Sequence, residues 1–194
     1  MVVGRVGRLE VARHAKRVPP RQDLEPSPAL SIVKRGPQRF EGRKLGILVT
    51  DGTDAALLNA LKTAITETAA TFEIVAPKVS GVKASDGSWI AADQMIDGGP
   101  SVLYDAVALL PGDAMMSGLL QESTARDFVA DAFAHCKFIG YVEAVAPLFE
   151  KAGITEKDRD EGFIALATPK DVAGFVGSLG KLRVWDREPK VKMH

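Results

Sequence analysis

Short, nearly continuous apolar runs alternate with amphipathic segments from Leu45 onward. Apolar runs bounded by Gly, Pro or Asp are typical of strands buried on both faces of a parallel sheet, and apolar residues three and four apart are typical of helices. The predicted strands are 45–49, 72–76, 104–110, 138–142 and 162–166, and the predicted helices are 55–68, 123–135, 143–152 and one opening at Thr168-Pro169. This alternation predicts an α/β protein, a doubly wound parallel sheet in a three-layer sandwich.

Three parts of the chain depart from this alternation. Residues 1–43 are basic and interrupted by prolines, which indicates an extended N-terminal arm or linker, with Leu30–Val33 able to dock as a strand or lie across a neighbour. So much extended chain is more typical of the C-terminal segment of a larger protein than of a catalytic domain. Residues 82–92 contain Asp86-Gly87 between short alternating runs, which predicts a hairpin. We therefore expect an arm over 1–43, a domain over 44–185 and a C-terminal tail over 186–194.

The charge is balanced overall but uneven along the 194 residues, with 25 Lys and Arg against 25 Asp and Glu. Basic residues outnumber acidic ones through Lys44: Arg5, Arg8, Arg13, Lys16, Arg17, Arg21, Lys34, Arg35, Arg39, Arg43 and Lys44 against Glu10, Asp23, Glu25 and Glu41. Basic arms are more often solvated or in contact with a partner subunit than bound to nucleic acid, so we expect no nucleic-acid partner. No apolar run approaches the length of a transmembrane helix, no secretory signal is evident, and no compartment is assigned.

Candidate chemistry lies where predicted strands end, because ligands of such sheets bind beyond the carboxyl ends of the strands. Three predicted turns, 51–54, 111–113 and 142–144, should converge there. The strand, turn and helix over 137–154 are typical of the place where many α/β hydrolases hold a nucleophile. The turn contains neither Ser nor Cys. The expected pocket residues are Asp51, Asp54, Gly112, Asp113, Glu143 and Ala144.

Glu143 has two interpretations. It is either a general acid or base whose pKa is raised by crowding with Asp54 or Asp113, or a helix-start carboxylate that favours the helix dipole, and we favour the second. The aspartates lack regular metal-ligand spacing and are better explained as turn caps, so we expect no metal site and no catalytic residue. The glycine pattern of a nucleotide or FMN loop is missing. Cys136, beside His135, is expected to be a packed small hydrophobe.

Three segments carry a resemblance: "LGILVTDGTDAALLNALKTA", "YDAVALLPGD" and "KFIGYVEAVAPLFEKAGI". Their layout resembles the class I glutamine-amidotransferase-like superfamily, including PfpI-type proteases, which has a flavodoxin-like fold. That resemblance implies a nucleophilic Cys in the turn over 141–145, which we call the elbow. It also implies a His directly after that Cys and a supporting Glu in the first helix. Matched residue by residue, Glu143 stands at the Cys position, Ala144 at the His position and Asp54 near the Glu position.

Residues 26–194 look closer still to the C-terminal domain of large-subunit catalases. The segments that carry this likeness are "PSPALSIVKRGPQRFEGRKLGILVTDG", "VKASDGSWIAAD", "AFAHCKFIG" and "LRVWDREPKVK". The resemblance implies an appended module without its own catalytic centre or cofactor, which supports the catalase core and neighbouring subunits of a tetramer. The haem that dismutates hydrogen peroxide belongs to the core, and neither Tyr104 nor Tyr141 lies in a segment that resembles it.

Other functions stay open. Glu143 could serve a degenerate PfpI-type hydrolase or glyoxalase, and the remnant pocket could sense a small molecule. A chaperone-like role toward unfolding proteins would use an adaptable apolar surface, for which the candidates are Met95, Ile96, Met115, Met116, Leu119 and Leu120. Trp89 and Trp185 are expected to be packing residues.

Overall fold

The computed structural model describes residues 21 and 23–191. The chain divides into two units, Met1–Gly36 and Pro37–His194. In the first unit a 3-10 turn, Pro28–Leu30, precedes α1 (Ile32–Arg35), where the Ser31 hydroxyl accepts a hydrogen bond from the Lys34 N–H. Leu30–Val33 is therefore not a strand, because a proline at the start of the turn and a serine N-cap both favour helical backbone. Residues 1–20 of the predicted arm lie outside the described residues.

The second unit contains a six-stranded parallel sheet in the order β5-β2-β1-β6-β7-β8. Its strands are β1 (Lys44–Val49), β2 (Thr71–Ala76), β5 (Gln94–Met95), β6 (Ala106–Leu110), β7 (Ile139–Tyr141) and β8 (Phe163–Ala165). β1 and β6 lie in the middle and are almost wholly buried, which explains their continuous apolar sequences. The predicted hairpin is present as β3 (Val82–Lys83) and β4 (Trp89–Ile90). The predicted α/β fold is confirmed.

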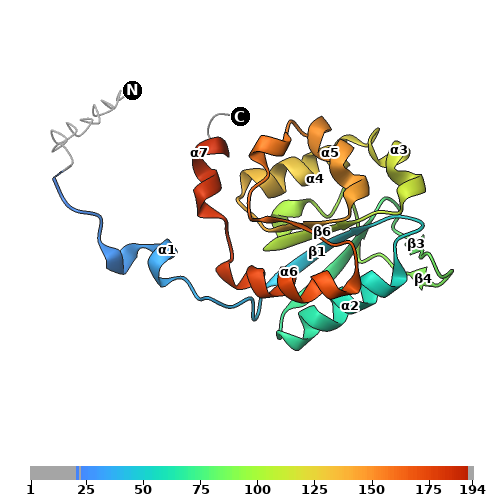
Figure 1. Cartoon of the computed structure of the whole chain (residues 1–194), viewed down its shortest axis with the longest axis horizontal. Coiled ribbons are helices and arrows are strands. Elements are labelled where there is room, and N and C mark those ends of the chain that lie inside the picture. The colour runs from blue at the N-terminus through green and yellow to red at the C-terminus, as the bar shows by residue number, and fades with distance from the viewer. Residues whose placement is uncertain (1–20, 22, 192–194) are drawn as a thin grey trace, which may run out of the picture. The chain divides into compact units, whose positions relative to one another are not determined.

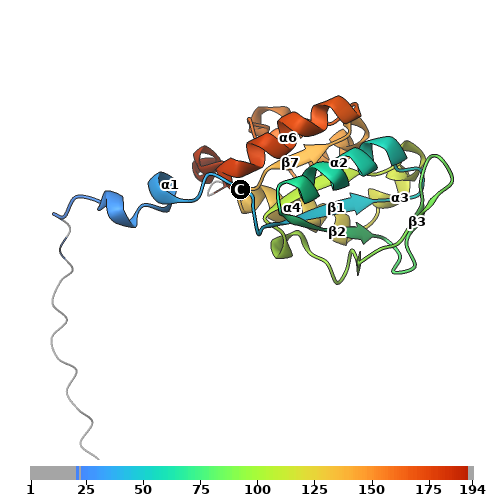
Figure 2. The same ribbon diagram turned by 90° about the horizontal axis from the view of Figure 1, so that it is seen from below.

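Helices cover both faces of the sheet (Figure 1). α2 (Ala55–Glu67) and α6 (Val172–Ser178) lie side by side on one face, as Figure 2 also shows. α3 (Met116–Leu119), α4 (Ser123–Ala134) and α5 (Ala146–Lys151) lie on the other. Each face has its own apolar core, and among the described residues no helix is long and apolar enough to cross a membrane.

The helix starts follow the predicted caps. The Thr168 side chain and the Asp171 carboxylate bond each other's backbone N–H groups before α6, with Pro169 at the first position of the turn. The predicted helix over 143–152 begins as a 3-10 turn, Glu143–Val145, and becomes regular as α5.

The last described residues contact the body. A further helix, α7 (Glu188–Val191), follows a 3-10 turn, Trp185–Arg187, within the segment interpreted from the sequence as a tail. Arg187 in that segment is fully buried. Trp89 and Trp185 were expected to be packing residues. In this chain Trp89 is 63% exposed and Trp185 is 38% exposed.

Candidate functional site

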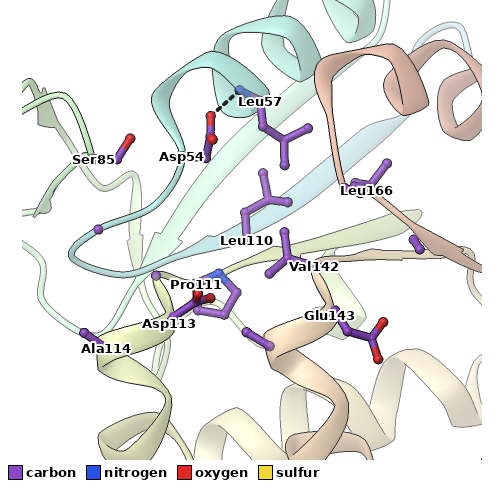
Figure 3. Close-up of a pocket in the computed structure, with 15 residues that line it drawn as sticks. Asp54, Leu57, Ser85, Leu110, Pro111, Asp113, Ala114, Val142, Glu143 and Leu166 are labelled. Atoms are coloured by element: carbon purple, nitrogen blue, oxygen red, sulfur yellow. Dashed lines mark hydrogen bonds between the residues drawn. The ribbon is translucent and has the colours of Figure 1, made fainter.

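A pocket of about 850 Å³ lies where the turns after β1, β6 and β7 meet (Figure 3). Five of the six residues expected there line it: Asp54, Gly112, Asp113, Glu143 and Ala144. Asp51 does not line it. The floor is apolar and includes Leu57, Leu110 and Leu166. The topology therefore brings the three predicted turns together at the carboxyl edge of the sheet, as expected for this architecture.

Two buried threonines connect the turn after β1 to the turn after β6 by hydrogen bonds. The Thr53 hydroxyl lies 2.7 Å from the Leu110 carbonyl oxygen, and the Thr50 hydroxyl accepts the Gly112 N–H at 2.9 Å. The two backbones approach so closely that a Cβ atom on Gly112 would lie 2.3 Å from the Asp51 carbonyl oxygen. Gly112 therefore allows the two turns to approach, because a side chain there would meet the Asp51 backbone. The two threonine contacts could not be predicted from the sequence.

The two aspartates of the first turn are engaged in structural bonds. An Asp54 carboxylate oxygen accepts the Leu57 N–H at 2.8 Å and caps α2 (Figure 3). An Asp51 carboxylate oxygen accepts the Lys83 N–H at 2.7 Å, and Gly52 donates its N–H to the Lys83 carbonyl. Asp51 thus holds the β3–β4 hairpin rather than lining the pocket. These contacts are those expected of turn caps.

The Glu143 carboxylate in the elbow lies apart from the carboxylates of Asp54 and Asp113. Glu143 is exposed at the first position of its 3-10 turn, and Asp113 is exposed at the first position of the turn after β6. Figure 3 shows the Glu143 side chain pointing away from Asp113 and Asp54. The carboxylate crowding on which the general acid or base interpretation depends is therefore absent from the arrangement of these three side chains.

The described residues that line the pocket offer little reactive chemistry. They include no Cys, His, Lys or Tyr, and the only hydroxyl among them belongs to Ser85. The Ser85 oxygen accepts the Ala55 N–H at 3.2 Å, and no His lies among the lining residues to activate it. Ser85 was missed in the sequence because it belongs to the hairpin and not to a turn that follows a strand of the main sheet.

The lining residues also do not fit a haem. Haem iron takes an axial His, Cys, Met or Tyr, and none of these lines the pocket. The Tyr104 hydroxyl donates to the Glu73 carboxylate at 3.1 Å, and the Tyr141 ring packs edge-on against Phe149. Within the described residues no group of three or more His, Cys, Asp or Glu could hold a metal ion.

Cys136 lies at the other edge of the sheet, before β7, and is 6% exposed. Burial raises the pKa of its thiol, which disfavours the reactive thiolate. His135 is exposed at the C-terminal end of α4. The expectation of a packed small hydrophobe agrees with this placement.

Six residues were expected to form an apolar surface, and this prediction is wrong for three of them. Ile96, Met116 and Leu119 are buried in the core under α4 and α5. Met95 and Met115 are exposed, and Leu120 is partly buried against the same core. Three of the six candidates are therefore core residues of the face that α3, α4 and α5 cover.

Comparison with known proteins places the chain in a family. The family described as "C-terminal domain found in long catalases" matches residues 41–189. Catalase C of Rhizobium meliloti (strain 1021) is 63% identical over 173 residues, covering 89% of this chain and 24% of that protein. Catalase HPII of Pseudomonas putida is 30% identical over 166 residues, covering 85% of this chain and 22% of that protein. The chain thus spans about a quarter of the length of these relatives.

Solved structures show the same fold at low identity. Oxidized DJ-1 of Toxoplasma gondii has a TM-score of 0.58 at 15% identity, covering 78% of this chain and 95% of that one. DJ-1beta of Drosophila melanogaster has a TM-score of 0.61 at 13% identity, covering 78% and 96%. These likenesses confirm the flavodoxin-like fold expected for the amidotransferase-like superfamily. The chain belongs to the family of C-terminal domains found in long catalases.

Proposed function

We propose that this chain is the C-terminal domain of a large-subunit catalase and performs no reaction of its own. The observation that carries the proposal is the elbow after β7, where the superfamily resemblance calls for a nucleophilic Cys and this chain has Glu143 followed by Ala144. A carboxylate there cannot form the covalent intermediates of a thiolate. The pocket scaffold is retained while the nucleophile and its partner base are lost.

The proposed role is to stabilise the parent enzyme. The peroxide would be dismutated at a haem in the catalase core, which this sequence does not contain. The partners would be that core and neighbouring subunits of the parent tetramer. Support comes from the match to a family of appended domains and from a body that has two apolar cores of its own.

The proposal is tested by comparing a full-length parent catalase carrying this domain with the same enzyme ending before it. We expect equal initial peroxide turnover per haem and a shorter half-life of the truncated enzyme on heating, since a lost interface lowers the barrier to inactivation. The isolated chain should show neither a Soret band nor oxygen release. Equal half-lives would reject the stabilising role, and oxygen release by the isolated chain would reject the absence of catalysis.

An enzymatic role for Glu143 makes the opposite prediction. A hydrolase or glyoxalase that uses this carboxylate would turn over small esters or methylglyoxal, and Glu143→Ala would abolish that turnover. We expect no turnover above the buffer rate in the wild-type chain, in Glu143→Ala or in the Cys136→Ala control. Activity in the wild type that disappears in Glu143→Ala would establish the alternative.

A chaperone-like role is a secondary proposal. It is favoured by exposed apolar side chains at the ends and loops of the carboxyl edge: Val79, Trp89, Met95 and Met115. Such side chains can bind exposed apolar segments of unfolding proteins. An equimolar amount of the chain should slow the aggregation of heated citrate synthase, and Met95→Lys with Met115→Lys should weaken that effect. Aggregation as fast as with serum albumin would reject the role.

A further inference from the structure

The last described residues form a segment, Leu182–Val191, that connects the two faces of the sheet. It follows the 3-10 turn Leu179–Lys181, which comes after α6 on one face, and reaches α7 on the face of α4 (Figure 1). Leu182, where it begins, has φ +65° and ψ −44°, a backbone conformation that costs energy for a residue other than glycine. The segment therefore starts at a strained backbone position.

One guanidinium holds the middle of this segment. Arg187 is fully buried, and its Nε and Nη2 atoms donate to the two Asp160 carboxylate oxygens, both at 2.8 Å. Its Nη1 atom donates to the Lys137 carbonyl at 2.8 Å. The guanidinium carbon lies 5.2 Å from the Phe133 ring centroid and 4.9 Å from that of Phe163. A bidentate, aromatic-flanked arginine of this kind is a strong and specific contact.

The rest of the segment is held by single hydrogen bonds and by partly buried side chains. The Val184 N–H donates to the Cys136 carbonyl at 2.8 Å, and the Val184 side chain packs where Gly162 leaves room for it. Trp185, Asp186, Glu188 and Pro189 are all exposed. The Arg183 guanidinium donates to the Asp105 carbonyl oxygen at 2.8 Å, and Leu182 and Val191 are partly buried against the two cores. Val184 is the one apolar side chain of the segment that is buried, so the segment buries little apolar surface for its length. Segments with few buried apolar contacts open locally at lower free energy than the whole fold.

The segment lies over the only thiol of the chain. Cys136 is 6% exposed and Lys137 is 2% exposed, and the segment bonds the carbonyl oxygens of both. Neither residue is reached from the pocket, which lies at the opposite edge of the sheet. The segment therefore bonds the backbone next to the thiol, and its Arg183, Arg187 and Glu188 charges act on the pKa of Cys136.

We infer that Leu182–Val191 is a latch that opens as a unit while the sheet stays folded, and that the Arg187–Asp160 contact sets how often Cys136 meets solvent. Opening separates Arg187 from Asp160 and from the Lys137 carbonyl, and it removes the cover from the face of α4. The latch is a conformational device of this domain and does not depend on the proposed role in a parent catalase.

The test measures the rate at which Cys136 of the 194-residue chain reacts with DTNB at rising urea concentration. A latch predicts a labelling rate that varies little with urea below the unfolding transition, because local opening exposes little surface. Asp160→Asn removes one charge of the pair and should raise that rate about 10- to 100-fold. Ile65→Val, in α2 on the other face, lowers global stability without touching the latch and should leave the rate at low urea unchanged.

Two outcomes would overturn the inference. In the first, labelling of the wild-type chain has the same steep urea dependence as global unfolding, which means that Cys136 is exposed only when the whole domain unfolds. In the second, Ile65→Val and Asp160→Asn accelerate labelling in proportion to their effects on global stability. If Asp160→Asn does not fold, the urea dependence of the wild-type chain decides alone.

Discussion

Lys137 has its amine in the core beside the latch. It is 2% exposed, and its Nζ atom donates to the Ser101 carbonyl. Burial, with a smaller contribution from Arg183, lowers the pKa of Lys137 to about 8, while Asp105 and Asp131 oppose that shift. An unfolded lysine titrates near 10.4, so between about pH 8 and pH 10.4 the unfolded chain binds more protons than the folded chain. The contribution of Lys137 to folding stability therefore rises with pH across that window.

Lys137→Met should remove this dependence. We expect the free energy of unfolding of the wild-type chain to rise relative to the variant by about 2 kcal/mol between pH 7.5 and pH 10. Urea denaturation of both proteins at the two pH values measures it. The pKa values of Cys136 and Tyr104 are both raised by burial, and their titration is common to the two proteins and cancels in the difference. A difference that is independent of pH would show that Lys137 titrates as it does in the unfolded chain.

The strands and helices differ in how far the sequence determined them. Strand 45–49 was predicted well because a central parallel strand is apolar at every position. β5 was missed because it has two residues and no pattern can emerge over that length. The C-terminal segment was interpreted as a tail, whereas Arg187 within it is buried and bonds Asp160, which is 27 residues away in sequence. Contacts of that kind leave no local pattern.

The turn after β6 gives a sharp test of how the pocket is built. Gly112→Ala places a Cβ atom 2.3 Å from the Asp51 carbonyl oxygen, so one of the two turns must shift. We expect a loss of about 1–3 kcal/mol in the free energy of unfolding, measured by urea denaturation. Gly174→Ala is the matched control, because Gly174 lies within α6 with open space around it, and alanine there should stabilise by about 0.5–1 kcal/mol. Equal effects of the two changes would contradict this account of the pocket.

The carboxyl-edge site could be located from the sequence, but its chemistry could not be completed from it. Topology alone brings the turns after β1, β6 and β7 together, so five of the six expected residues line the pocket. A capping role was expected for the aspartates, whereas the direction of the Glu143 side chain and the contribution of Ser85 depend on side-chain geometry that no spacing encodes. The sequence therefore located the site and its missing nucleophile, and the structure adds the directions and bonds of the side chains.

The extent of the folded body is set by contacts that precede its first strand. Phe40 is 4% exposed within the core under α2 and α6, and an Arg43 guanidinium nitrogen lies 3.1 Å from an Asp105 carboxylate oxygen. A chain that starts at Lys44 lacks both contacts, whereas a chain that starts at Pro37 keeps them. We expect the shorter chain to be less stable by about 3 kcal/mol, mostly from the lost burial of the phenyl ring. Urea denaturation of the two chains measures the difference, and Phe40→Ala in the longer chain should account for most of it. Equal stabilities would place the boundary of the body at β1 and would mean that Phe40 contributes nothing to the core it occupies.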